Sequence, residues 1–187
     1  MELIHYPNPV LRKRAAPVAS IDDGVRSRVS DMFQIMYRER GVGLAAPQVG
    51  WSVRLFIMNA LGEPDPPDPA GEKVFINPEI ILAEGELLDE EGCLSIPLVR
   101  GKVLRSQRVK VRALGLDGQP FEQELQDLGA RAVEHELDHL DGILFISRLG
   151  AAERLQVGRQ LKKLEKEYKQ KKVLGAGPAG RTLLSPK

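Results

Sequence analysis

The 187-residue sequence has few of the residues that would identify several classes of protein. Its single cysteine, Cys93, excludes an intrachain disulfide and makes a reducing compartment, the cytoplasm, the expected location. The chain has no apolar run near the ~20 residues that span a membrane. No secretory signal pattern follows Met1. The length predicts one domain, since domains usually have roughly 100–200 residues.

The chain also lacks a strong excess of charge of either sign. Its formal net charge of +1 argues against a protein dedicated to nucleic-acid binding. The charge is nevertheless uneven, because residues 1–152 carry −6 and residues 153–173 carry +5, with 8 Lys and Arg against 3 Asp and Glu. This predicts an acidic body and a basic C-terminal segment. A solvated helix face is the simpler interpretation of that segment, and a docking surface is the alternative.

Hydrophobic periodicity predicts helices at 22–40, 128–140 and 152–172. It predicts strands at 51–59, 73–76, 79–83, 108–114 and 120–125. Gly41 and Gly43 are expected to end the first helix. Four prolines and three acids at 62–71 indicate a surface loop. Because the strands precede the helices rather than alternating with them, the pattern favours an α+β fold over a doubly wound sheet.

The strongest chemical signal is His135-Glu136-Leu137-Asp138-His139, an H-E-x-x-H pattern in a segment predicted to be helical. Residues four apart lie on one face of a helix, so the two imidazoles can reach one metal ion. Glu136 would project beside the metal, where it suits a general base and acid acting on a water molecule. Two histidines without a metal, on the surface or in the core, are the simpler alternative.

The third ligand is not fixed by this pattern. A downstream metzincin histidine is excluded, because Phe145 stands at that position. The remaining soft ligand is Cys93, in a glycine-containing polar stretch where tight turns are expected. A free cysteine is more often a small buried hydrophobic residue. If Cys93 does bind, a Cys/His/His set leaves a fourth position open to water, as in catalytic zinc sites.

The stretch GVGLAAPQVG at 41–50 is the second unusual feature. Gly41, Gly43 and Ala46 match a dinucleotide-binding G-x-G-x-x-G/A pattern. That pattern must follow a strand and open a helix, whereas here a helix precedes it. A turn of small residues is one interpretation. The other is a strand edge that an extended peptide can approach closely, with Gln48 supplying an amide donor at its end.

Three segments together, GVGLAAPQ at 41–48, EGCLS at 91–95 and HELDH at 135–139, resemble the signature motifs of the peptide deformylase family in sequence, order and spacing. The resemblance covers residues 1–172. It implies an α+β fold with mixed or antiparallel sheets around a central metal-binding helix, and with N-terminal and C-terminal helices. The helix at 152–172 is similar to that of the bacterial class with a helical C-terminus.

The resemblance also implies the reaction, removal of the formyl group from N-formylmethionine of newly made polypeptides with release of formate. It implies one divalent metal ion, Fe(II) natively, with Zn, Ni or Co as further candidates in purified protein. The implied metal ligands are Cys93, His135 and His139, with Glu136 as general base and acid. The implied oxyanion site consists of the Gln48 side chain and the Leu94 backbone N–H.

The substrate contacts follow from the same resemblance. It implies that Arg100 and the strand edge at Val42, Gly43 and Leu44 contact the peptide, and that Val42 and Leu128 line the methionine pocket. Asp89 departs from the family pattern, because many relatives carry an apolar residue there and the wall of the pocket is expected to differ.

The expected organisation is one catalytic domain at 1–172 followed by a flexible tail at 173–187. The expected partners are N-formylmethionyl nascent peptides, with transient ribosome contact through residues 153–173 as a resemblance-based candidate. No membrane and no specific DNA binding are expected. Two other classes stay open from the residues alone. One is a zinc endopeptidase with its third ligand downstream of the motif, and the other is a non-catalytic metal or interaction module.

Overall fold

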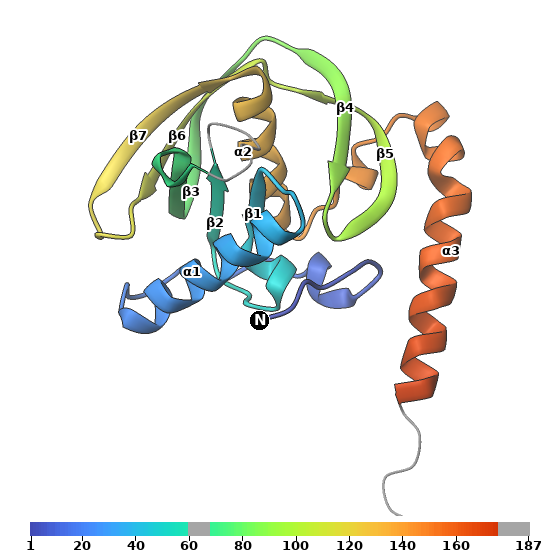
Figure 1. The fold of residues 1–187 in the computed structure, drawn as a ribbon. Coiled ribbons are helices and arrows are strands. Elements are labelled where there is room, and N and C mark those ends of the chain that lie inside the picture. Colours follow the sequence, from blue (N-terminus) through green and yellow to red (C-terminus); the bar gives the residue numbers. More distant parts are fainter. Residues whose placement is uncertain (60–67, 176–187) are drawn as a thin grey trace, which may run out of the picture.

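The protein is described by a computed structural model that covers residues 1–59 and 68–175. The fold is α+β, as expected (Figure 1). Most of the expected surface loop at 62–71 lies outside the described residues, as does most of the expected tail at 173–187. Among the described residues, no helix is both long enough and apolar enough to cross a membrane.

The larger of two sheets is antiparallel and has five strands in the order β1-β2-β3-β6-β7. The strands are β1 (Gly43–Ala45), β2 (Leu55–Asn59), β3 (Glu72–Glu84), β6 (Arg108–Leu114) and β7 (Pro120–Gln126). The expected hairpin at 108–125 is confirmed, with β6 and β7 paired in register from Arg108 with Gln126 to Leu114 with Pro120. Because β1 lies at one end of the strand order, it pairs only with β2 in this sheet.

The predicted strands at 73–76 and 79–83 are one continuous strand, β3. The pairing of β3 with β6 shifts between Ile76 and Glu79, where a bulge interrupts the ladder. Asn77 takes the left-handed backbone conformation there, with φ +51°, and its side chain hydrogen-bonds both backbone groups of Val18. The irregularity that looks like a strand end in the sequence is therefore a bend inside a strand.

The smaller sheet is a two-stranded hairpin of β4 (Leu87–Cys93) and β5 (Ile96–Arg105), which the sequence analysis did not predict. Its turn, Leu94-Ser95, follows Cys93 directly. The apolar face of β5 packs into a core cluster that includes Phe145 of the short helix η4 (Phe145–Ser147). This hairpin places Cys93 beside the helix that carries both histidines.

Helix α2 (Asp127–Leu140) lies between the large sheet and the β4–β5 hairpin (Figure 1). All its residues from Ala130 to Leu140 except Glu134 are buried. One face contributes Val133, Leu137 and Leu140 to a core cluster with the large sheet. The other face turns its polar residues towards the hairpin. The helix expected at 128–140 is therefore the central helix of the fold.

Helix α1 (Asp23–Arg38) packs on the large sheet through Val25, Val29, Met32, Phe33, Ile35 and Met36. The first helical turn is capped by Asp22, whose carboxylate accepts a hydrogen bond from the Val25 N–H at 2.9 Å. The expectation that a glycine ends this helix is wrong in detail. Arg40 rather than a glycine takes the left-handed conformation, with φ +56°, and the Gly41 N–H then donates to Met36 O at 2.8 Å.

Helix α3 (Ala151–Gly175) runs beside β5 at the outside of the molecule (Figure 1). It extends three residues beyond its expected end at 172. Val157 is buried in the cluster formed with β5, and Leu161 and Leu164 are partly buried against it. Most of its other described side chains are exposed, so the helix has a narrow apolar stripe and a broad basic surface.

Candidate metal centre and active site

Three side chains that can bind a metal converge from two elements. Cys93 ends β4, and His135 and His139 lie one turn apart on α2. Their ligand atoms all lie within 4.8 Å of one another, and Cys93 Sγ is 3.2 Å from His139 Nε2. Two imidazoles and a thiol form a donor set that suits zinc and other divalent transition metals. The structure therefore brings together the residues that the sequence singled out.

His135 is held by a carboxylate on the side away from its ligand nitrogen. Its Nδ1 donates to Oε1 of Glu91 at 2.5 Å. This hydrogen bond leaves Nε2 as the nitrogen with a free lone pair, and a carboxylate in this position also makes the imidazole a better ligand. Burial would raise the pKa of Glu91, but hydrogen bonds from His135 and Arg105 lower it to about 2. Glu91 is therefore ionised at neutral pH.

Glu91 belongs to a buried chain of charges that runs behind the candidate ligands. Arg105 donates two hydrogen bonds to Glu91, at 3.1 and 2.8 Å, and one to Asp138 at 2.6 Å. Arg148 holds the other side of Asp138, and Arg131 donates to Glu91 at 3.2 Å. Both carboxylates are thus paired, which buried charges require. This network fixes β4 and β5 to α2.

Glu136 lies beside the donor set without a role in this network. Its side chain is buried, and Oε2 has no hydrogen-bond partner among the described residues. Burial raises the pKa of Glu136 to about 7. A carboxyl group with such a pKa can both accept and donate a proton near neutral pH. A side chain on Gly43 would place its Cβ 2.7 Å from Glu136 Oε1, so glycine at this position leaves room for the carboxylate.

Gln48 is fixed at the opposite side of the donor set. It lies in the short helix η2 (Ala46–Val49) and is only 1 % exposed. Its Oε1 accepts a hydrogen bond from the Ala45 N–H at 2.8 Å, which orients the amide. Its Nε2 then points towards Ser95 Oγ at 3.2 Å and Cys93 Sγ at 3.6 Å. An N–H donor is thereby directed at the candidate metal centre.

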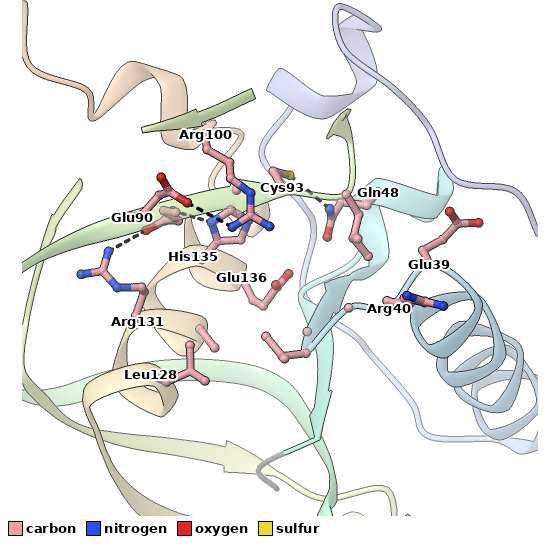
Figure 2. A pocket seen from close by; sticks show the side chains of 17 residues that line it. Glu39, Arg40, Gln48, Glu90, Cys93, Arg100, Leu128, Arg131, His135 and Glu136 are labelled. Atoms are coloured by element: carbon pink, nitrogen blue, oxygen red, sulfur yellow. Dashed lines mark hydrogen bonds and ion pairs between the residues drawn. The ribbon is translucent and has the colours of Figure 1, made fainter. Parts of the chain in front are cut away.

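These side chains open onto a cavity of about 470 Å³ (Figure 2). The lining includes nine of the eleven predicted site residues: Val42, Gly43, Gln48, Cys93, Leu94, Arg100, Leu128, His135 and Glu136. The other two lie behind the wall. His139 is 1 % exposed, and the Leu44 side chain is buried in the core between α1 and the large sheet. Asp89 is exposed and does not line the cavity.

Comparison with known proteins places this site in a family. Residues 1–155 match the family model described as polypeptide deformylase. The chain belongs to the peptide deformylase family. A peptide deformylase of Acidobacterium capsulatum is 46 % identical over 164 residues, which cover 88 % of this chain and 95 % of that protein. One of Alkalilimnicola ehrlichii is 44 % identical over 181 residues, covering 97 % of this chain and 98 % of the relative.

The solved structures agree with this assignment. Peptide deformylase 1B of Arabidopsis thaliana superposes with a TM-score of 0.86 at 37 % identity, over 97 % of this chain and 98 % of that chain. The peptide deformylase of Plasmodium falciparum gives a TM-score of 0.86 at 36 % identity, over 90 % of this chain and 98 % of that chain. The expected α+β deformylase fold is confirmed, including the C-terminal helix α3.

Membership of this family also establishes the reaction that the protein catalyses. The protein is a metal-dependent hydrolase that removes the formyl group from N-formylmethionine of new polypeptides. The zinc endopeptidase and the non-catalytic module, which the residues alone left open, are therefore set aside.

The side chains that support the site could not be recognised from the sequence. Glu91 and His135 lie 44 residues apart along the chain, and Arg105 and Asp138 lie 33 residues apart, so no local pattern links them. The only signal was position, because Glu91 lies two residues before Cys93 and Asp138 lies between the two histidines. Arg40 and Arg131 also line the cavity and carried no signal that distinguished them from surface charges.

Proposed function

We propose that Cys93, His135 and His139 hold the metal ion of this deformylase and that Glu136 moves the proton. The observation that carries the proposal is the convergence of three ligand atoms within 4.8 Å of one another, next to a buried carboxylate in the same cavity. A divalent ion bound there supplies Lewis-acid chemistry, which polarises a carbonyl group or a water molecule.

Glu136 takes a proton from the attacking water and delivers it to the amine that departs when formate is released. A pKa of about 7 suits both steps at neutral pH, and burial keeps bulk water from competing for the proton. General acid–base catalysis of this kind contributes roughly 10²- to 10⁴-fold.

Two donors stabilise the negative charge that develops on the formyl oxygen. Gln48 Nε2 is fixed in advance, because the Ala45 N–H holds the other end of the amide. The Leu94 backbone N–H, in the turn after Cys93, is the second donor. Donors positioned before the reaction need no reorganisation, and losing one typically costs about 2.7–4 kcal/mol of transition-state stabilisation.

The peptide binds along the outer edge of β1, which pairs with β2 on its other side only. An extended substrate adds to this edge through main-chain hydrogen bonds, next to Val42 and Gly43. Leu44 contributes its backbone alone, since its side chain is buried in the core. Leu128 is 60 % exposed at the cavity, which suits a wall for the methionine side chain. Arg100 contacts the peptide from the hairpin side.

We further propose Fe(II) as the native metal, with Zn, Ni and Co as substitutes in purified protein. A thiolate and two imidazoles suit any of these ions, so the donor set alone does not select iron. The cytoplasm, where formylated polypeptides are made, is the proposed location. A transient contact with the ribosome through residues 153–173 remains a proposal, supported by the +5 charge of that segment.

The metal content of a ligand variant tests the proposed site. Protein prepared without oxygen is expected to hold one metal ion per chain, and Cys93→Ala is expected to lose it together with formate release from a formyl-Met peptide. Cys93→Ser tests whether an oxygen ligand retains part of the binding. If Cys93→Ala kept a full complement of tightly bound metal, the proposed ligand set would be wrong.

A further inference from the structure

Arg40 is an exposed cation at the wall of the active-site cavity. It follows the last turn of α1, and its left-handed backbone, with φ +56°, is fixed by hydrogen bonds from its own N–H to Tyr37 O and from Gly41 N–H to Met36 O. Figure 2 shows Arg40 and Glu39 on the side of the cavity opposite Glu90 and Arg131. The backbone therefore fixes the point at the cavity wall from which this side chain extends.

The other exposed charges around the cavity already have partners. Arg100 pairs with Glu90 at 3.3 Å, and Glu39 pairs with Arg38 at 3.0 Å. The deeper Arg131 is bound to Glu91. Arg40, by contrast, has no ion pair or side-chain hydrogen bond with any described residue. It is thus the one cation in the described lining whose charge is not already matched.

The order of residues along the peptide-binding edge shows what Arg40 would meet. Gly43 lies beside Glu136, and Gln48 lies beside Cys93, so the chain approaches the reacting centre as it runs from 40 to 48. A peptide whose formyl end is at that centre runs away from it, antiparallel to β1. Successive residues in an extended strand are about 3.3 Å apart. The residues after the methionine therefore pass Val42 and Gly41 and reach Arg40.

We propose that Arg40 is a specificity-determining residue that favours an acidic side chain at the second or third position of the formylated peptide. The inference rests on the proposed function, because it takes the formyl end to lie at Cys93, His135 and His139. Arg40 touches neither the reacting atoms nor the metal ligands. Its contribution is therefore expected in KM rather than in kcat, at the scale of a solvent-exposed ion pair, about two- to fivefold.

The test compares formyl-Met tripeptides that carry Asp, Asn or Lys at the second position, or at the third, with alanine elsewhere. The wild-type protein at low salt is expected to have kcat/KM about two- to fivefold higher for Asp than for Asn at one of these positions, and lower for Lys. Arg40→Glu is expected to reverse the order, and Arg40→Lys to retain it. High salt is expected to remove the preference, because it screens exposed charges.

Two further variants control for effects on folding and for effects of the protein's net charge. Arg40→Gly removes the charge while keeping a residue that favours the left-handed backbone, and is expected to abolish the preference. Lys13→Glu makes the same change in charge at an exposed residue outside the cavity and is expected to keep the preference.

Equal kcat/KM for Asp, Asn and Lys peptides in the wild type would overturn the inference. So would a preference that survives in both Arg40→Glu and Arg40→Gly. Neither result affects the proposed function, which is tested separately by formate release from the all-alanine reference peptide, formyl-Met-Ala-Ala, with the metal-loaded protein.

Discussion

Oε1 of Glu91 lies 2.5 Å from Nδ1 of His135, so the residue two positions before Cys93 orients a second candidate metal ligand 44 residues further along the chain. One short segment, Glu91-Gly92-Cys93, thus contains one candidate ligand and the side chain that supports another. Metal binding at the proposed site is consequently expected to be coupled to the packing of β4 against α2.

Glu91→Gln is expected to weaken metal binding by about 10- to 100-fold, because removing a carboxylate behind a metal-bound histidine typically has this effect. Competition with a chelator of known affinity measures the change directly. Glu86→Gln is the matched control, since Glu86 is exposed and lies outside the buried network. Equal metal affinities for the two variants would show that Glu91 does not support the site.

Arg105→Met is expected to destabilise the metal-free protein by about 3–5 kcal/mol, because it leaves two buried carboxylates without their shared partner. Arg108→Met removes a guanidinium that also bridges two carboxylates, Glu84 and Glu124, but at the surface. This control substitution is expected to lower the free energy of unfolding by less than about 1 kcal/mol. Denaturant unfolding of both variants measures the difference. If the two variants lost similar amounts of unfolding free energy, burial would not determine how much these ion pairs contribute to stability.

The N-terminal segment is expected to respond to alkaline pH through Tyr6. Burial and a hydrogen bond to Glu165 of α3 raise the pKa of Tyr6 to about 12, from 10.0. Since the folded-state pKa lies above the unfolded value, the stabilisation is complete below pH 10 and is lost as the pH rises through 12. Ultraviolet titration of phenolate formation, compared with Tyr6→Phe, isolates this group. A midpoint near pH 10 for the ionisation of Tyr6 would contradict this prediction.

The basic surface of α3 is expected to determine any salt-dependent contact with ribosomes. Replacing Lys162, Lys166 and Lys169 by glutamate is expected to weaken co-sedimentation and to flatten its salt dependence, because fewer phosphate contacts release fewer counterions. The matched control places glutamate at the exposed residues Lys13, Lys73 and Lys102. Unchanged binding by the α3 variant would show that this helix is not the docking element.

The candidate ligands could be predicted because their signal is local or nearly unique. His135 and His139 lie four residues apart, and helical periodicity alone places them on one face. Cys93 is the only cysteine, so few other donors compete for the third position. The three family motifs then made the fold and the reaction predictable.

The parts of the fold that the sequence did not reveal depend on contacts between distant residues. The hairpin of β4 and β5 carries acidic and basic residues at several positions, which hides the alternation of a strand. Its register is set instead by the burial of Ile96, Val99 and Val103 against η4 and α3. The bulge at Asn77 is likewise stabilised from outside, by backbone groups of Val18, 59 residues away.

Turnover of Glu136→Gln, measured as formate release from a formyl-Met peptide with the metal content determined on the same sample, tests the central claim most directly. Glu136 is not among the proposed ligands, so the variant is expected to keep one metal ion per chain. Its kcat is expected to fall by roughly 10²- to 10⁴-fold, the contribution of general acid–base catalysis. Near-wild-type turnover with the metal still bound would contradict the assignment of proton transfer to Glu136.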